Sequence, residues 1–264
     1  MNRILVFFFF LIFFSCQANK YAATNKVYKR QVKQLAKEIM RQPLNGNKKT
    51  WVGTTNFGLR KPDFVIIHHT AQDSCEQTLK TFTMPRTQVS AHYVICKDGT
   101  VHHMLNDYLR AWHAGTGSWG NNRDINSCSI GIGLDNDGFE PFAEEQINSL
   151  LVLLDTLKTR YNIPQNNFIG HGDIAPTRKN DPNFSFPWED LASLGFGIWY
   201  RDTSAIQLPE DFDAIRALRI IGYSVQDTPA TIMQFKRHFM QVEGDSILAE
   251  GDKKVIYDLM KQSM

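Results

Sequence analysis

The order of hydrophobic and polar positions predicts strands and helices in alternation. Short runs of β-branched and aromatic residues are typical of buried strands. Such runs occupy residues 64–68, 89–96 and 127–134. Apolar residues at helical spacing fill residues 75–83 and 143–161 between and after them. A Lys-Asp-Gly-Thr turn follows the second strand and predicts an antiparallel partner at residues 101–105. This alternation, with one hairpin, predicts an α/β protein with a mixed central β-sheet flanked by helices.

Beyond residue 200 the pattern becomes helical. Apolar residues recur at helical spacing around Leu218, Phe235 and Leu259, and glycine-containing segments separate the three stretches. Residues 201–264 therefore predict a small C-terminal three-helix domain. Near the other end of the chain, residues 32–40 predict one amphipathic helix.

Composition adds little to the prediction of the fold, but it bears on which class of partner the chain binds. Hydrophobic residues make up 42% and charged residues 21% of the 264 residues, as in an ordinary globular protein. The formal net charge is only +2, which is far from the strongly basic balance of a typical nucleic-acid-binding domain. We therefore expect no nucleic-acid partner.

The first 15 residues predict a lipoprotein signal peptide. Arg3 supplies a positive charge near the start, and residues 4–14 form an apolar run that is too short to span a bilayer. Cys16 follows a small residue directly after this run, so we expect it to become the lipidated first residue of the mature chain. An ordinary secretory signal with an incidental cysteine is the alternative. Residues 16–46 then predict a tether and the N-terminal helix.

Three further cysteines remain, and an odd number cannot pair completely. One disulfide is possible in an oxidising compartment. Cys96 and Cys128 stand at the ends of predicted strands, so we expect them to pair if those strands are neighbours, rather than to pair with Cys75. Because no Cys-x-x-Cys spacing occurs, we assign none of the three to a metal site.

Residues that can bind a metal gather between residues 168 and 182. A short apolar run ends at His171, and the glycine and prolines that follow predict a rigid, non-helical loop. Such a loop can direct His171 and Asp181 at one point, with Lys179 between them. A histidine nitrogen and an aspartate oxygen are zinc-type ligands.

A third ligand is available from the strand at residues 64–68, which ends at His68. Three protein ligands with an open fourth position are typical of a catalytic zinc site. In the alternative interpretation, His68 and His171 are hydrogen-bonded core residues and Asp181 is a turn residue.

Several segments together resemble one enzyme family. They read Ile-Ile-His-His-Thr-Ala at 66–71, Val-Ser-Ala-His-Tyr at 89–93, Ala-Trp-His-Ala-Gly at 111–115, a strand-like run at 126–132, and His-Gly-Asp-Ile-Ala-Pro at 171–176. In this order they resemble the zinc-dependent N-acetylmuramoyl-L-alanine amidases of the amidase_2 family, within its AmiD-like lipoprotein branch. Residues 47–200 are thus expected to be the zinc amidase domain. Residues 201–264 resemble, more weakly, a helical peptidoglycan-binding module, and the alternative is a bundle that only packs on its neighbour.

The resemblance implies a site and a reaction. One zinc ion would be held by His68, His171 and Asp181, with Lys179 beside it as a catalytic residue. The substrate would be the amide bond between N-acetylmuramic acid and L-alanine in peptidoglycan, which is cut in cell-wall turnover and recycling. Tryptophan faces stack well on sugars, although Trp112 could instead be a core residue. We assign to substrate binding His69, His92, Trp112, His113 and Trp119.

One catalytic position departs from the family. Its members carry a glutamate in the pattern Ser-Ile-Gly-Ile-Glu, on a strand facing the zinc, where this chain has Gly133. Glycine cannot transfer a proton, which leaves three interpretations open. The chain keeps zinc and substrate with low activity, or Asp135 substitutes through a water, or His113 or His92 acts as the base. The tyrosine that some relatives use instead would stand at Ala91, so that route is closed.

These features predict an enzyme of the bacterial cell envelope. We expect a monomer that faces the periplasm, acts on peptidoglycan or muropeptides, and is held by a lipid at Cys16 on a membrane, which we expect to be the outer membrane. A non-catalytic, zinc-containing peptidoglycan-binding protein is the main alternative, and a transport or structural lipoprotein is a third. Turnover of muropeptides separates the first two, and zinc content separates the third from both.

Overall fold

The structure, a computed structural model, describes residues 19–40 and 53–264. The chain divides into two compact units, residues 1–57 and 58–264. The predicted signal peptide, Cys16 and the end of the predicted tether lie outside the described residues. Across the residues that are described, no helix is both long and apolar enough to cross a membrane.

The first unit contains helix α1 (Ala22–Ile39). It confirms the amphipathic helix predicted over residues 32–40 and begins well before it. Lys37 lies in its last turn, where a positive charge interacts favourably with the helix dipole.

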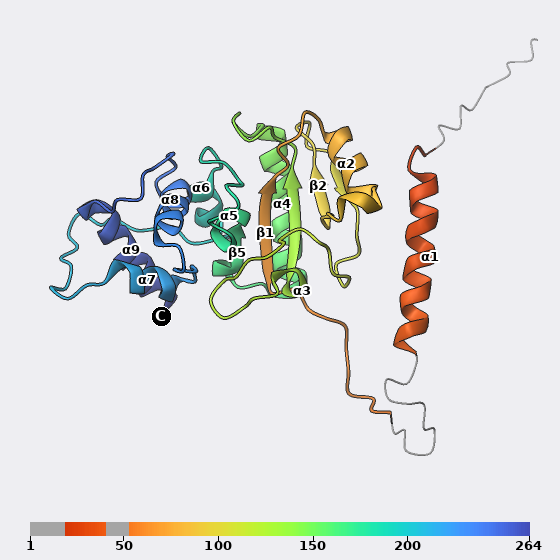
Figure 1. Ribbon diagram of the computed structural model, residues 1–264, viewed down its shortest axis with the longest axis horizontal. Coiled ribbons are helices and arrows are strands. Elements are labelled where there is room, and N and C mark those ends of the chain that lie inside the picture. The colour runs from red at the N-terminus through yellow and green to blue at the C-terminus, as the bar shows by residue number, and fades with distance from the viewer. Residues whose placement is uncertain (1–18, 41–52) are drawn as a thin grey trace, which may run out of the picture. The chain divides into compact units, whose positions relative to one another are not determined.

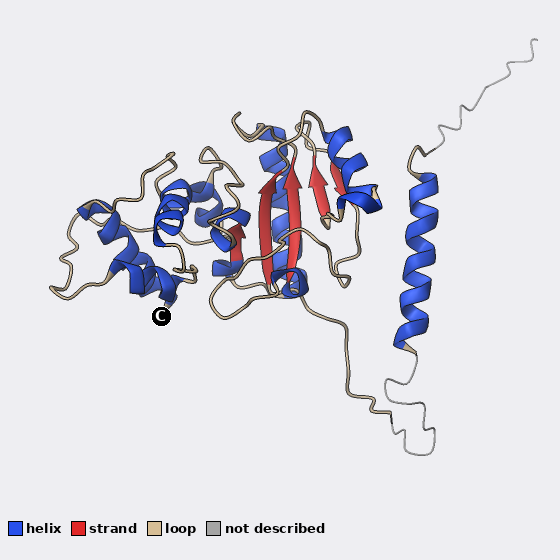
Figure 2. Cartoon of the chain, viewed as in Figure 1, coloured by secondary structure: helices blue, strands red, loops and turns tan. Residues whose placement is uncertain are grey.

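The second unit is built on a five-stranded sheet with the strand order β3-β2-β4-β1-β5. Strand β3 is antiparallel to β2 and the other neighbouring pairs are parallel, so the sheet is mixed, as predicted (Figure 2). Three predicted strands are too long, and their extra residues form loops or the helical turn α3 (Ile125–Cys128). The strands are β1 (Phe64–His69), β2 (Tyr93–Ile95), β3 (Val101–His103), β4 (Ser129–Leu134) and β5 (Phe168–Gly170).

Both faces of the sheet are covered, and every residue of β1 and β4 is buried. This explains why these strands read as nearly continuous apolar runs. On one face, Val65 and Ile67 pack with leucines of α4 (Glu144–Tyr161), which runs along β1 and β4 in Figure 1. On the other face, Ile66 packs with Ile125 of α3.

The other helices largely confirm the predicted ones. Asp213 and Asp227 cap two of them by accepting hydrogen bonds from backbone N–H groups of the first turn. One prediction is wrong, because the chain forms a helical turn, α5, where a non-helical loop was expected after β5. These elements are α2 (Cys75–Thr83), η1 (Pro85–Thr87), η2 (Gln165–Asn167), α5 (His171–Ile174), α6 (Trp188–Ser193), α7 (Ala214–Ile221), α8 (Thr228–Phe239) and α9 (Glu250–Ser263).

Helices α7, α8 and α9 form the C-terminal helical part of the second unit (Figure 1). They share a hydrophobic cluster of their own, centred on Leu218, Phe235 and Ile256. The three predicted C-terminal helices are therefore present. The domain boundary near residue 200 stays a prediction, because the helices belong to the same compact unit as the sheet.

The disulfide joins Cys75 to Cys96, so the predicted pairing of Cys96 with Cys128 is wrong. Strands β2 and β4 are neighbours, as that prediction required, but they are parallel, and Ile95 lies opposite Leu134. Cys96 therefore follows the C-terminal end of β2, whereas Cys128 precedes the N-terminal end of β4, at the opposite edge of the sheet. Cys128 keeps a free thiol.

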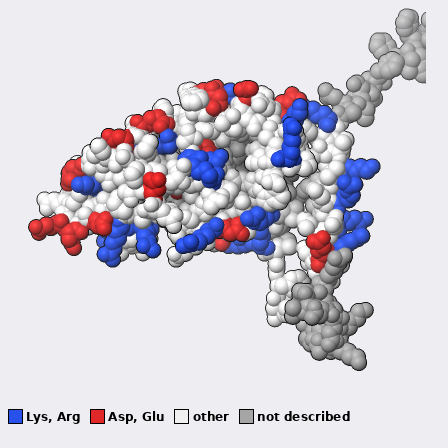
Figure 3. All heavy atoms as spheres, viewed as in Figure 1, with Lys and Arg blue, Asp and Glu red and all other residues white. Residues whose placement is uncertain are grey.

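The surface carries charges of both signs. Figure 3 shows acidic and basic side chains on the same face of the molecule. Some of them pair directly, as Lys97 does with Glu140 and Arg110 does with Asp124. Such pairing is in line with the small net charge of +2.

Candidate metal centre

The sheet brings together two histidines that are far apart in sequence. Strands β1 and β5 are adjacent and parallel, so their C-terminal ends meet at one edge of the sheet. His68 lies at the end of β1, and His171 begins α5 directly after β5. The chain then returns to the same place, because the N–H of Gly172 donates a hydrogen bond to the carbonyl oxygen of Asp181 at 2.7 Å.

Three potential ligand atoms form a nearly equilateral triangle there. Nδ1 of His68 lies 2.9 Å from Oδ2 of Asp181 and 3.0 Å from Nδ1 of His171, and these last two atoms are 3.0 Å apart. All three residues are buried, with exposed fractions of 8%, 5% and 3% for His68, Asp181 and His171. The three atoms lie close enough together to bind a single ion, so the spacing fits zinc.

Hydrogen bonds behind the histidines fix which nitrogen of each ring carries the proton. Nε2 of His171 lies 3.0 Å from the carbonyl oxygen of Ala114, which can only accept. His171 therefore carries its proton on Nε2. In the neutral ring, Nδ1 then presents a lone pair to Asp181 and His68.

A series of hydrogen bonds fixes which nitrogen of His68 carries the proton. The hydroxyl of Ser129 donates its only hydrogen to the carbonyl oxygen of Ile125 at 2.6 Å, so its oxygen accepts from Nε2 of His113 at 3.0 Å. Burial, together with the neighbouring His68, lowers the pKa of His113 well below its usual range, so this ring is neutral. Its Nδ1 must therefore accept from Nε2 of His68, 3.1 Å away. Nδ1 of His68 is left with a lone pair.

When both rings are neutral, three electron pairs face one another with no proton between them. Two come from imidazole nitrogens and one from the carboxylate of Asp181. Burial lowers the pKa of His68 to about 4, which keeps its ring neutral at neutral pH. Neutral imidazoles and a carboxylate are the ligands that zinc prefers, and a cation is what stabilises three acceptors held this closely.

Gly131 leaves room for the ring of His113, which is hydrogen-bonded to His68. A Cβ built on Gly131 would lie 2.3 Å from Cγ of His113, so the ring of His113 packs directly on the backbone of β4. Nothing larger than glycine fits at this position unless His113 moves. Sequence reasoning missed the roles of Ser129, Gly131 and the Ala114 carbonyl, since each depends on contacts between distant segments.

The two predicted catalytic positions lie close to the centre. Lys179 is half-buried, and its charge lowers the pKa of His68 in addition to the larger effect of burial. Gly133 lies on β4, the neighbour of β1, at the level of His68.

The proposed replacements for the missing glutamate are not placed to act. Asp135 lies against β2, where its N–H donates to the carbonyl oxygen of Ile95. Burial raises the pKa of its carboxyl, and the charge of Lys97 acts in the opposite direction. His92 is fully buried, with Nδ1 accepting from the N–H of Gly131 and Nε2 donating to the carbonyl of Leu109, each at 3.0 Å.

Both nitrogens of His113 are engaged in the same way as those of His92. In this structure His92 and His113 make structural contacts, and their assignment to substrate binding stays a prediction. Trp112 is 53% exposed, so it is not a core residue.

Two other predicted substrate contacts are less accessible. Trp119 packs edge-on against Tyr223, with ring centroids 4.8 Å apart. His69 is 8% exposed, and its buried Nδ1 has no hydrogen-bond partner among the described residues.

Known proteins of similar sequence are amidases. The Amidase_2 family model, described as N-acetylmuramoyl-L-alanine amidase, matches residues 58–184. The chain is 34% identical over 206 residues to the N-acetylmuramoyl-L-alanine amidase AmiD of Escherichia coli, which covers 66% of this chain and 74% of the relative. It is 38% identical over 107 residues to the 1,6-anhydro-N-acetylmuramyl-L-alanine amidase AmpD of Citrobacter freundii, covering 40% and 57%.

Solved structures agree with the sequence comparison. AmiD of Escherichia coli, in complex with its substrate anhydro-N-acetylmuramic acid-L-Ala-D-γ-Glu-L-Lys, matches 81% of this chain and 96% of its own, with 26% identity and a TM-score of 0.70. AmpDh3 of Pseudomonas aeruginosa matches 84% of this chain and 98% of its own, with 26% identity and a TM-score of 0.71. The chain therefore belongs to the Amidase_2 family of N-acetylmuramoyl-L-alanine amidases.

Proposed function

We propose that the chain binds one zinc ion and hydrolyses the amide bond between N-acetylmuramic acid and L-alanine in peptidoglycan fragments. The observation that carries this proposal is the triangle formed by Nδ1 of His68, Nδ1 of His171 and Oδ2 of Asp181. Zinc held there would polarise the amide carbonyl and lower the pKa of a bound water toward ~7. Similar proteins solved with anhydromuramic peptides support this class of substrate.

The chain's own residues take the remaining roles. We propose that the ammonium of Lys179 stabilises the negative charge that develops on the carbonyl oxygen during attack. Loss of one such donor typically costs about 3 kcal/mol in the transition state. Trp112, with its exposed ring, is the aromatic side chain that we propose for stacking on a sugar.

Proton transfer is the step for which the chain lacks the glutamate of its family. The reaction needs a group that takes a proton from water and gives it to the leaving nitrogen. Gly133 cannot do this, both nitrogens of His92 and of His113 are engaged elsewhere, and Asp135 lies against β2. Loss of a general base typically lowers the rate by ~10²–10⁴-fold, so we propose slow turnover with intact zinc and substrate binding.

The second candidate is a peptidoglycan-binding protein that contains zinc and has no turnover. The same residue, Gly133, favours it. The two proposals share the metal centre, the muropeptide ligand and a binding role for residues 201–264. They differ only in whether L-alanine-containing peptides are released.

One experiment tests both. The purified mature chain is analysed for zinc, then incubated with defined muropeptides, and the products are followed by liquid chromatography and mass spectrometry. One zinc per chain and slow release of peptides beginning with L-alanine would support the amidase. Zinc and muropeptide binding without release would favour the second candidate, and a zinc-free chain after purification without chelators would contradict both.

We also propose an address in the cell envelope. The disulfide between Cys75 and Cys96 supports an oxidising compartment such as the periplasm. A lipid at Cys16 would hold the protein, as a monomer, on a membrane, which we propose to be the outer membrane. Mass spectrometry of the mature N-terminus in the native host, with Cys16→Ala as control, tests the lipid. Membrane fractionation tests the address.

A further inference from the structure

One buried carboxylate close to the metal centre has no role in the proposed chemistry. Asp173 lies two residues after His171, within the same helical turn α5, and its side chain is completely buried. A buried charge is costly unless several donors satisfy it. The carboxylate of Asp173 accepts hydrogen bonds from four donors.

Three of these donors come from the C-terminal helical part. The hydroxyl of Tyr223 donates to Oδ1 at 2.8 Å, Nε2 of Gln234 donates to the same oxygen at 3.2 Å, and Nδ1 of His238 lies 2.7 Å from Oδ2. The fourth donor is the N–H of Gly170, at 2.8 Å from Oδ2. Gly170 is the last residue of β5 and directly precedes His171, so the carboxylate links the helices to both sides of that histidine.

Close packing accompanies these hydrogen bonds. A Cβ on Gly172 would lie 2.4 Å from the side-chain oxygen of Gln234, so α8 lies directly against the residue that follows His171. The ring of His238 stacks on that of Trp188, with centroids 4.1 Å apart. The contacts therefore involve both α5 and α6.

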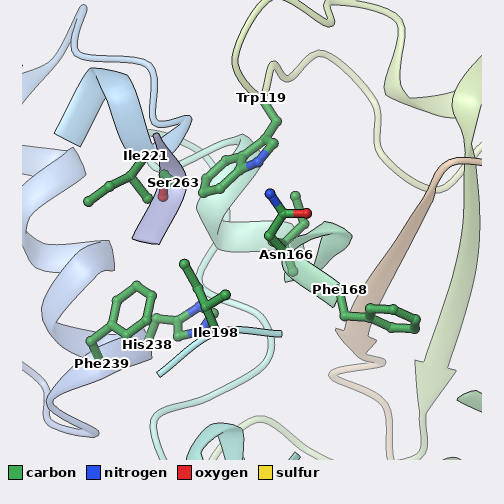
Figure 4. Close-up of a pocket in the computed structure, with 9 residues that line it drawn as sticks. Trp119, Asn166, Phe168, Ile198, Ile221, His238, Phe239 and Ser263 are labelled. Carbon is green, nitrogen blue, oxygen red and sulfur yellow. The ribbon is translucent and has the colours of Figure 1, made fainter. Parts of the chain in front are cut away.

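One part of the seam between the helical part and the sheet is closely packed. The N–H of Gly120 donates to the carbonyl oxygen of Gly222 at 2.7 Å, and Trp119 packs beside it. Figure 4 shows Trp119 and His238 approaching the same small cavity from opposite sides, and its volume is about 20 Å³. Such a volume holds about one water molecule, so the contact is close here, while a larger cavity of about 750 Å³ lies between residues 174–177 and 219–227.

We infer that Asp173 is a positioning residue through which Tyr223, Gln234 and His238 hold the metal ligand His171 in place. This inference rests on the proposed metal centre. It gives residues 201–264 a role in building that centre, in addition to any binding of peptidoglycan. The Asp173 carboxylate accepts a hydrogen bond from Gly170, directly before His171, and three hydrogen bonds from the helical part. These contacts fix the backbone on both sides of His171.

The test compares variants of two buried carboxylates in the full mature chain. Asp173→Asn removes the charge that the helical part satisfies. Asp258→Asn is the matched control, since Asp258 is also buried and accepts hydrogen bonds from Arg201 and Gln262, away from α5. Zinc affinity is measured by competition with a chelator, and hydrogen exchange is measured for peptides that span residues 168–182.

We expect Asp173→Asn to weaken zinc binding by about tenfold, as loss of support behind a ligand does. We also expect faster exchange in residues 168–182, while Asp258→Asn leaves both measurements near the wild-type values. Equal effects of the two variants, or an unchanged zinc affinity in Asp173→Asn, would overturn the inference.

Two further arms keep the test decisive. If Asp173→Asn does not fold, Tyr223→Phe replaces it, since this variant removes a single hydroxyl, and Tyr257→Phe in α9 is its control. Weaker zinc binding and faster exchange only in Tyr223→Phe would support the inference, and equal effects of both variants or an unchanged zinc affinity would overturn it. If the wild-type chain binds no zinc, the proposed function fails, and hydrogen exchange alone decides the inference. Faster exchange in residues 168–182 only for the Asp173 or Tyr223 variant would support it, and unchanged exchange would overturn it.

Discussion

Gly133 lies directly opposite His68 in the ladder that joins β4 to β1. Residues paired in this way project on the same face of the sheet, so a carboxylate at position 133 would stand beside the metal ligand. A Cβ built on Gly133 would meet Cγ2 of Thr70 at 3.4 Å and a ring carbon of Phe82 at 3.9 Å, which are ordinary contacts. The sheet therefore has room for the first atom of the missing side chain.

Gly133→Glu should increase the rate of amide hydrolysis. The new carboxylate would supply the proton transfer that the chain lacks, an effect of ~10²–10⁴-fold in typical enzymes. The measurement is the initial rate of peptide release from a defined muropeptide at saturating zinc.

Gly133→Gln is the matched control, because it adds the same volume without a group that can accept a proton at neutral pH. It should leave the rate at the wild-type level. Equal rates for the glutamate and glutamine variants would show that position 133 does not limit turnover.

Ser129→Ala should weaken the metal centre without touching a ligand. His113 loses the acceptor that fixes the proton on its Nε2, so Nδ1 of His68 is no longer held in the unprotonated form. Loss of such support typically costs ~10–100-fold in metal affinity. The direct readout is the tautomer of His68, from ¹⁵N chemical shifts of histidine-labelled protein, with zinc affinity measured in parallel.

Ser127→Ala is the control for this variant. Ser127 lies two residues earlier, and its hydroxyl bonds to Asp124 and Arg110 instead of to a histidine. The hypothesis predicts that it leaves both the His68 tautomer and the zinc affinity unchanged. A wild-type tautomer in Ser129→Ala would contradict the assigned proton positions.

The sequence predicts the meeting of His68, His171 and Asp181 better than it predicts what surrounds them. His68 and His171 each follow a run of apolar residues, and this local signal places both at the ends of strands. Their meeting requires only that two parallel strands be adjacent. The support given by Ser129 or by Asp173 depends instead on how loops and helices pack across the sheet, and no local pattern records that packing.

The wrong disulfide has a similar cause. Neighbouring strands were expected to bring Cys96 and Cys128 together, but strand direction decides which ends meet, and the short apolar runs carry no information on direction. Residue 75 lies at the start of a helix that packs near the end of β2, a tertiary arrangement that the spacing of cysteines does not show.

Replacing both Cys75 and Cys96 with alanine should destabilise the second unit. The disulfide closes a loop of 21 residues in sequence separation, for which the chain-entropy model gives about 3 kcal/mol. Urea unfolding of the oxidised wild type and of the double variant measures the difference. Cys128→Ala, which removes the free thiol, should change the free energy of unfolding far less, and a similar loss in both proteins would show that the effect does not come from the disulfide.

The free energy of unfolding should decrease as the pH is lowered from about 6.5 to about 4, and His92 should account for part of this decrease. Burial lowers the pKa of this fully buried ring from 6.5 to about 4, although its hydrogen bond to Leu109 acts in the other direction. Across this window the unfolded chain binds a proton that the folded chain does not, so the free energy of unfolding rises with pH. The full contribution is about 3 kcal/mol, present above pH 6.5 and lost on approaching pH 4.

The measurement is urea unfolding of the zinc-free chain at several pH values, for the wild type and for His92→Gln. Glutamine does not titrate, so the variant should be less stable at neutral pH but should lose less stability on acidification. The difference in slope should approach ~1.4 kcal/mol per pH unit, the value for one proton. Because other buried histidines titrate in both proteins, their contributions cancel in this comparison. Parallel slopes would mean that His92 takes up its proton in the folded chain as readily as in the unfolded one, which the hydrogen bond that its Nδ1 accepts from the N–H of Gly131 argues against.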